Sequence, residues 1–264
     1  DIEQRQFAEY LLRLGNGELP LNTMEEIELS QDIISNTNLI DEVFGSCFAS
    51  ENYEGMKDRA ILAPLNKDVD KINDKIIAKL PGEYKIYHSH DSIKDQPERA
   101  LEFTTEFLNS VNISDLPPHE LKLKKNALIM LLRNLDASEG LCNGTRLIVT
   151  SLCNNIIKAK IVTGEQSGKE VHIPRITLDS SKGQLGCTMQ RHQFPVRPAF
   201  AMTVHKAQGQ TFEFVGVDLK SPVFMHGMLY VAFSRVKRPS TLKILLPKEN
   251  PRHTRNIVWK EVLG

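Results

Sequence analysis

The chain has 264 residues, enough for one large domain or two small ones with hydrophobic cores of their own. Its 33 basic and 33 acidic residues cancel to a net charge of zero, and 41% of its residues are hydrophobic, as in an ordinary globular protein. No apolar run approaches the roughly 20 residues that a membrane helix needs, so the sequence excludes a helical membrane protein and predicts no membrane partner.

The four cysteines are scattered along the chain without a close pair. Zinc sites use ligands at short spacing, and disulfide-rich domains carry paired cysteines. We therefore expect no metal site and no disulfide framework in this chain, and a reducing intracellular environment. The cysteines themselves are predicted to be plain buried or surface thiols: Cys47, Cys142, Cys153 and Cys187.

The net charge of zero hides an uneven distribution along the sequence. Residues 1–45 carry ten acids against two arginines, whereas residues 182–264 carry thirteen lysines and arginines against four acids. Residues 180–212 contain no acid at all. Such a basic C-terminal third predicts a surface that attracts phosphate groups. The alternative is that two oppositely charged halves simply pack together.

The first 58 residues predict two helices in an acidic, turn-rich segment. Apolar residues recur at helical spacing until Gly15 and Gly17 end the first helix: Phe7, Tyr10, Leu11 and Leu14. A second, short helix is expected near residues 37–48. Within it, Leu39–Glu42 has the apolar-then-acidic pattern of a magnesium-binding strand end. The apolar part is too short for such a strand, and the residues that follow continue a helical period, so we assign this run to the helix.

The next segment predicts one strand–turn–helix unit of a parallel α/β sheet. Residues 59–63 form a buried strand, and a turn at Pro64–Asn66 follows. Asn66 is placed to cap a helix whose apolar residues are Val69, Ile72, Ile76 and Leu80, and which Pro81 ends. Residues 82–120 are polar and are expected to form a surface excursion.

From residue 121 the pattern changes to short β-rich runs separated by Gly and Asn turns. Strands are expected at residues 127–132, 146–150, 156–162 and 170–173, which together suggest a small antiparallel barrel. The α/β pattern then returns, with strands at 199–204, 214–219 and 242–246 and a helix at 227–235. The sequence therefore predicts an α/β lobe, built from residues 1–120 and 190–264, with a small β-barrel of residues 121–189 inserted into it.

The residues that carry chemistry gather in two places. An apolar run ends in the polar block Thr203–Thr211, and about twenty residues later a single arginine, Arg235, closes a second apolar run. An arginine is always charged and forks onto phosphate oxygens, which suits it to sensing the terminal phosphate of a nucleotide. The alternative is that Arg235 caps the C-terminal end of its own helix, where the helix dipole favours a cation.

The polar block also suits the binding of a nucleic-acid backbone. Hydroxyl, imidazole and ammonium groups at a strand end can contact phosphates without reading sequence, and Thr203, His205 and Lys206 supply them. Gln208 and Gly209 follow directly, and a glycine allows close backbone approach to a ligand.

Three blocks in this order resemble superfamily 1 DNA helicases of the petite-integration-frequency type, which are relatives of RecD. Ile61–Asn66, extending to Asn73, is similar to motif IV of that family, Thr203–Thr211 to motif V, and Gly227–Arg235 to motif VI. Residues 127–134 and 140–146 resemble the run that enters the family's Src-homology-3-like insertion. Residues 193–197 and 7–17 look most like the helicase region of eukaryotic Helitron rolling-circle transposons.

The resemblance implies a RecA-like second motor lobe and a set of functional positions. Arg235 would contact the γ-phosphate of ATP across a cleft, with Gln208, Gly209 and Tyr230 on the nucleotide side. The residues that would face single-stranded DNA are Pro64, Asn66, Thr203, His205 and Lys206. Members of the family move 5′ to 3′ on single strands and unwind duplex DNA at junctions, using ATP and Mg²⁺. The resemblance further implies roles in DNA repair and recombination and a nuclear, or else mitochondrial, location.

One departure from the family pattern is large. The chain contains no G-x-x-x-x-G-K-[ST] phosphate loop, and no apolar strand ends in the Asp-Glu pair that holds magnesium. The chain begins with Asp1 rather than Met, so we expect it to be a piece of a longer protein whose N-terminal motor lobe carries both features. By itself the chain should lack ATPase activity. The alternative function is a non-catalytic, transposon-derived remnant that keeps the fold and binds DNA or a protein.

Overall fold

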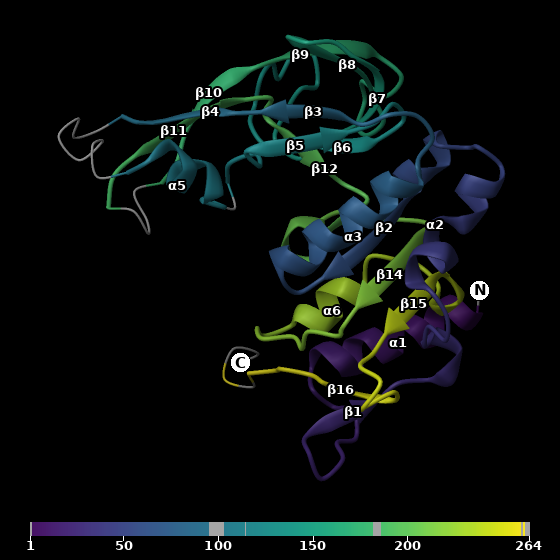
Figure 1. The fold of residues 1–264 in the computed structure, drawn as a ribbon. Coiled ribbons are helices and arrows are strands. Elements are labelled where there is room, and N and C mark those ends of the chain that lie inside the picture. Colours follow the sequence, from purple (N-terminus) through teal and green to yellow (C-terminus); the bar gives the residue numbers. More distant parts are fainter. Residues whose placement is uncertain (1, 95–102, 114, 182–185, 260, 262–264) are drawn as a thin grey trace. The chain divides into compact units, whose positions relative to one another are not determined.

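The computed structural model describes residues 2–94, 103–113, 115–181, 186–259 and 261, and it consists of two compact units (Figure 1). The first unit contains residues 1–76 and 200–264, and the second contains residues 77–199. The predicted insertion, residues 121–189, lies inside the second unit, which extends beyond it at both ends. The second unit is larger than the predicted insertion, because strands before residue 121 pair with strands of the insertion and of the segment that follows it.

A four-stranded parallel sheet forms the centre of the first unit. Its strands, in spatial order, are β13 (Ala201–Thr203), β2 (Arg59–Ala63), β14 (Phe214–Asp218) and β15 (Leu242–Leu245). The strands are short apolar runs, as expected where both faces of a parallel sheet are covered. All four predicted strands of the α/β lobe are thereby confirmed.

Helices predicted from apolar periodicity are also present in the first unit. They are α1 (Ile2–Gly15), α2 (Leu39–Ala49), α3 (Asn66–Lys79) and α6 (Met228–Phe233), of which α3 continues past residue 76 into the second unit. The Asn38 side chain caps α2 by accepting a hydrogen bond from the Ile40 amide at 3.0 Å. The helix assignment of Leu39–Glu42, in place of a magnesium-binding strand end, is confirmed.

Helix α2 packs across β2, β14 and β15, and one glycine allows its close approach. A Cβ atom on Gly216 of β14 would lie 2.8 Å from Cγ2 of Val43 and 3.0 Å from Cδ1 of Leu39. Phe44 of α2 also meets Phe200 edge-on, with ring centroids 5.9 Å apart, and both rings are fully buried. This contact lies in the core of the first unit.

Four single-turn 3-10 helices and a two-stranded ribbon complete the first unit among the described residues. The 3-10 helices are η1 (Gln31–Ile33), η2 (Glu54–Asp58), η3 (Val204–Ala207) and η4 (Pro239–Thr241). In the ribbon, β1 (Glu26–Glu28) pairs antiparallel with β16 (His253–Arg255). The ribbon was not predicted, because three-residue polar strands carry no measurable period.

The second unit contains a five-stranded antiparallel sheet. Its strands, in spatial order, are β12 (Val196–Pro198), β6 (Leu128–Leu131), β7 (Arg146–Leu152), β8 (Ile156–Ile161) and β9 (Glu170–Pro174). The strands predicted from residue 127 to residue 173 are thus confirmed. Buried and exposed residues alternate along β9 and most of β8, so one face of these strands lies on the core. The ladders among the described residues leave β12 and β9 at the ends of the order, and closure into a barrel stays a prediction.

The prediction of a surface excursion at residues 82–120 is wrong. This segment contains β3 (Lys85–His88), β4 (His90–Ile93), α5 (Thr105–Ser110) and the start of β5 (Glu120–Leu123). Strand β3 pairs with β5, and β4 joins the sheet β10 (Ile176–Asp179)–β11 (Met189–Gln193). The partner of β4 lies about one hundred residues away in the sequence, so local polarity gave no sign of the pairing. Residues 95–102 and 114 lie outside the described part.

A buried ion pair holds β4, β11 and α5 together. The Arg191 Nε donates to Asp91 Oδ1 at 2.9 Å and its Nη2 to Asp91 Oδ2 at 2.7 Å, and both side chains are almost fully buried. The remaining guanidinium hydrogens reach the backbone carbonyls of Pro117 and Leu108. Because the pair is bidentate and further hydrogen-bonded, burial of its charges is compensated.

The cysteines and the lengths of the helices were also predicted from the sequence. All four cysteines are free: Cys47 and Cys187 are buried, Cys142 is half-buried and Cys153 is exposed. None of the helices in the described residues is long and apolar enough to cross a membrane.

Two glycine-to-alanine changes should shift the free energy of unfolding in opposite directions. Gly216→Ala forces α2 away from β14 and should destabilise the protein by about 1–3 kcal/mol. Gly45→Ala, in the middle of α2, meets only ordinary contact at 3.8 Å and should stabilise it by about 0.5–1 kcal/mol through helix propensity. Urea denaturation of both variants tests this, and equal stability of the two would contradict the packing described.

Candidate nucleic-acid and nucleotide site

Two neighbouring strand ends bring together the residues predicted to face a nucleic acid. Strands β2 and β13 are parallel, and Thr203 is the register partner of Ala63. The turn at Pro64–Asn66 and the η3 turn with His205 therefore leave the same edge of the sheet side by side. The carboxyl ends of parallel strands are where ligands bind in open α/β sheets.

The five residues at this edge differ in how accessible they are. His205 is exposed, Lys206 and Asn66 are half-buried, and Pro64 is buried. Thr203 is only 9% exposed, so only a small part of its surface is open to a ligand.

A buried amide fixes the position of β13 against α3. The Asn73 Nδ2 donates to the Ala201 carbonyl at 3.0 Å, and the Ala201 amide donates to Asn73 Oδ1 at 2.8 Å. Asn73 is 4% exposed and thus satisfies both backbone groups of an edge-strand residue, as a neighbouring strand would. Sequence reasoning assigned Asn73 no role. The available signal was a polar residue beside the apolar positions Ile72 and Ile76.

The loop that follows β14 reaches the same edge of the sheet. Ser221 donates its hydroxyl to Asp68 Oδ2 at 2.7 Å, which ties this loop to the first turn of α3. The ring of Phe224 lies 6.5 Å from that of His205 between centroids. The loop thus borders the predicted strand-binding residues, and sequence reasoning did not identify it.

Arg235 follows α6 and is bonded to acceptors of its own chain. Its Nε donates to the Val231 carbonyl at 2.8 Å, its Nη1 to the carbonyls of Gln210 at 2.9 Å and Ala207 at 3.4 Å, and its Nη2 to Ser234 Oγ at 2.8 Å. The bond to Val231 is the helix-end contact that the alternative interpretation predicted. The bonds to residues 207 and 210 in addition join Arg235 to the polar block. Burial lowers the pKa of Arg235, but an arginine remains charged at neutral pH.

The other residues predicted on the nucleotide side lie near the same loop or on α6. Gln208 and Gly209 are exposed, and Gly209 has a φ of +80°, which favours glycine. Tyr230 is partly exposed, and its ring covers Gly15, where a Cβ atom would lie 3.1 Å from Cδ2 of the ring. The structure therefore places Tyr230 against the C-terminal end of α1.

Arg235 and the residues predicted to face a nucleic acid lie toward opposite edges of the sheet, joined by one segment. The Arg235 carbonyl accepts from the Phe212 amide at 2.8 Å, and Phe212 lies just before β14 begins at Phe214. Arg235 therefore lies toward the amino edge, whereas Thr203 ends β13 at the carboxyl edge. Residues 204–213 run from one edge to the other, between the end of β13 and the start of β14.

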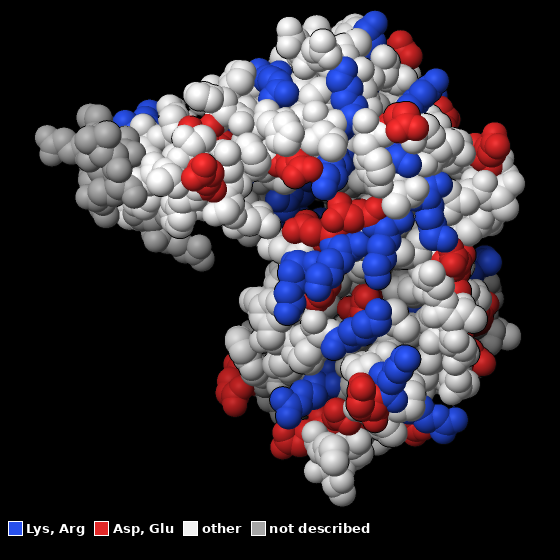
Figure 2. Space-filling view, in the orientation of Figure 1, with Lys and Arg blue, Asp and Glu red and all other residues white. Residues whose placement is uncertain are grey.

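Two arginines of the acid-free segment 180–212 are engaged inside the protein. Arg191 is 1% exposed and neutralised by Asp91, and Arg197 is half-buried and donates to the Leu116 carbonyl at 3.2 Å. Residues 182–185 lie outside the described part. Figure 2 instead shows lysines and arginines over α3 with acidic side chains among them. Arg191 and Arg197 therefore add little to a phosphate-attracting surface, and the attraction expected of the basic C-terminal third stays a prediction.

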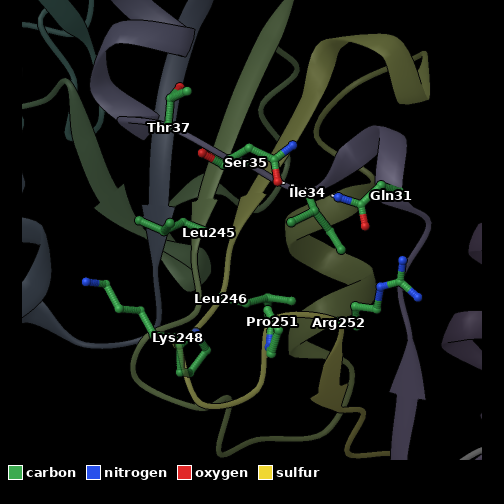
Figure 3. Close-up of a pocket in the computed structure, with 11 residues that line it drawn as sticks. Gln31, Ile34, Ser35, Thr37, Leu245, Leu246, Lys248, Pro251 and Arg252 are labelled. Carbon is green, nitrogen blue, oxygen red and sulfur yellow. Dashed lines mark hydrogen bonds between the residues drawn. The ribbon is translucent and has the colours of Figure 1, made fainter.

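A separate pocket of about 480 Å³ lies at the carboxyl end of β15 in the first unit (Figure 3). Residues before α2 and residues after β15 line it, among them Ser35, Thr37, Leu245, Lys248 and Arg252. The hydroxyls of Ser35 and Thr37 both donate to Glu42 Oε1. None of the predicted site residues lines this pocket. Across the described residues, no cluster of three or more His, Cys, Asp or Glu side chains is arranged for a metal ion.

Known proteins match the chain at the segments described above. The family model "DNA helicase Pif1, 2B domain" matches residues 106–152, and "UvrD-like helicase C-terminal domain" matches residues 198–242. The human ATP-dependent DNA helicase PIF1 is 30% identical over 211 residues, which is 78% of this chain and 30% of that protein. In sequence, the chain is similar to the C-terminal region of Pif1-type helicases.

Solved structures show the same fold. A crystal structure of Pif1 helicase from Candida albicans superimposes with a TM-score of 0.62 at 21% identity, covering 98% of this chain and 56% of that one. A structure of Bacteroides Pif1 bound to ssDNA gives a TM-score of 0.53 at 21% identity, covering 83% of this chain and 52% of that one. The fold is therefore the RecA-like α/β fold of Pif1 helicases. The chain spans about half of these structures and less than a third of the human relative.

Removal of the Asn73 amide should loosen β13. Asn73→Ala leaves the Ala201 amide and carbonyl buried without these partners and should destabilise the protein by about 2–4 kcal/mol. Lys75→Ala, on the exposed face of the same helix, serves as the matched control and should change stability by less than about 0.5 kcal/mol. Hydrogen exchange at the Ala201 amide is the direct measurement, and unchanged protection in Asn73→Ala would refute the clamp.

Proposed function

We propose that this chain is the second motor lobe, with an inserted β domain at residues 121–189, of an ATP-dependent DNA helicase. The helicase moves 5′ to 3′ on single-stranded DNA and unwinds duplex at junctions. The observation that carries the proposal is the pairing of β2 with β13, because it brings the turns of two helicase-like motifs to one sheet edge. The similarity to Pif1-type helicases supports the same conclusion.

In this proposal the carboxyl edge of the sheet binds the DNA backbone. His205 and Lys206 contact phosphates, while Asn66, Thr203 and Pro64 shape the turn against which the strand lies. These contacts read no bases, as required for a motor that moves along any sequence.

The amino edge serves the nucleotide. Arg235 contacts the terminal phosphate of ATP, and Gln208, Gly209 and Tyr230 border the same nucleotide. A phosphate that reaches Arg235 must replace some of its bonds to the carbonyls of residues 207 and 210. Such an exchange frees the loop that leads back to His205, and it gives a physical route from ATP binding to the grip on DNA. Mg²⁺ and the phosphate loop belong to the N-terminal motor lobe in this proposal, so the chain alone does not hydrolyse ATP.

Further expectations from the sequence remain proposals. They are a relationship to Helitron helicases, roles in DNA repair and recombination, and a nuclear or mitochondrial location. The alternative, a transposon-derived remnant without catalytic use, differs in one measurable respect. It predicts that removing the Arg235 side chain does not change the rate of ATP hydrolysis when a phosphate-loop lobe is supplied.

The chain should bind single-stranded DNA, and its affinity should fall steeply with salt because counterions are released from the phosphates. Lys206→Ala should weaken binding several-fold and reduce the salt slope by about one unit. Arg255→Ala removes an exposed charge from β16 and serves as the control, with both quantities unchanged. Fluorescence anisotropy between low and high salt measures both. Absence of binding at low salt would count against the proposed function.

Joined to a lobe that carries a phosphate loop, the chain should support ATP hydrolysis that depends on Arg235. Arg235→Ala should lower the turnover rate about a thousandfold or more, because an arginine that stabilises the transferred phosphate contributes this much. Arg235→Lys keeps the positive charge but loses the two-pronged guanidinium contact with phosphate, so its turnover rate should also fall strongly. DNA affinity should stay largely intact, and Lys237→Ala, an exposed neighbour, should leave turnover unchanged. Turnover that survives in Arg235→Ala would disprove the assigned role.

A further inference from the structure

The loop between β14 and α6 exposes large apolar and aromatic side chains beside the carboxyl edge of the sheet. Phe224 is 50% exposed and Met225 is 41% exposed, and His226 follows them directly. Clusters of exposed large apolar side chains are uncommon on soluble domains and mark surfaces that bind something. The loop is also held in place, since Ser221 bonds to Asp68 and the Gly227 amide donates to the Ile257 carbonyl at 2.9 Å.

Two rings of this loop each lie beside a ring from another part of the chain. Phe224 lies near His205 with a centroid distance of 6.5 Å, and His226 stacks on Trp259 at 5.7 Å with an interplanar angle of 21°. The Trp259 amide also donates to His226 Nδ1 at 2.9 Å, and its side chain is 53% exposed. Each exposed aromatic ring thus has a histidine beside it, and the stacked, hydrogen-bonded pair of His226 and Trp259 limits the side-chain freedom that Trp259 loses when a ligand binds.

We propose that Phe224 and Trp259, each supported by its histidine, form a platform on which unpaired bases of single-stranded DNA stack. The inference rests on the proposed function and adds contacts with bases to contacts with phosphates. Its chemical basis is the position of Phe224 near His205, which Lys206 follows in the chain, because single-strand binding combines cations that follow the backbone with aromatic faces that accept any base. Duplex DNA does not fit this platform, since the faces of its bases are already stacked on one another.

The test compares two strands of equal length and charge, an oligothymidine and the same backbone without bases. The unmodified chain should bind oligothymidine about tenfold more tightly than the abasic strand at low salt. Phe224→Ala and Phe224→Leu should lose most of that preference while keeping the abasic affinity, whereas Phe224→Tyr should retain it. Tyr84→Ala, an exposed aromatic of the second unit, is the matched control and should retain the preference.

An independent readout comes from Trp259, the single tryptophan of the chain. Its fluorescence should be quenched by oligothymidine and remain unchanged with the abasic strand, because only a base can stack on the indole. Equal affinity of the unmodified chain for both strands would overturn the platform and leave the phosphate contacts of the proposed function standing. A preference that persists in Phe224→Ala would also overturn it, and would leave the loop as a surface for a protein partner. Binding of neither strand would overturn the platform and the proposed function together.

Discussion

The parallel pairing of β13 with β2 is the constraint on which the candidate site depends. It places Thr203 opposite Ala63, so that two turns from distant parts of the sequence leave the sheet at one edge. β13 is only three residues long and lies at the edge of the sheet, where it has a ladder on one side only. The Asn73 amide completes its hydrogen bonding from the other side. A helix from the motif IV segment therefore fixes the position of the motif V strand.

The segment after β13 then links this edge to the opposite one. It starts at the η3 turn, passes the carbonyls that bind the Arg235 guanidinium, and enters β14. Arg235 is therefore bonded both to the end of its own helix and to this loop.

The second unit shows why charge counted along a sequence is a poor guide to a binding surface. Arg191 belongs to the acid-free segment, yet its charge is cancelled by Asp91 and hidden from solvent. The partner lies one hundred residues earlier in the chain, in a segment that looked like a polar loop. Most polar side chains of that segment are exposed or half-buried, but its strands still form, because backbone pairing with distant partners satisfies their hydrogen bonds.

Periodicity by itself determined the apolar strands and helices of both units, because their faces repeat at 2 or 3.6 residues and need no knowledge of distant partners. The order of the polar block and Arg235 likewise determined the family resemblance. Only the tertiary structure decided which residues meet: the clamp of Asn73 on Ala201, the pairing of β4 with β11, and the loop of Phe224 beside His205. Each of these contacts joins residues that are distant along the chain. Their free energy comes from satisfying buried polar groups or pairing rings, and no local pattern in the sequence encodes which partner will be there.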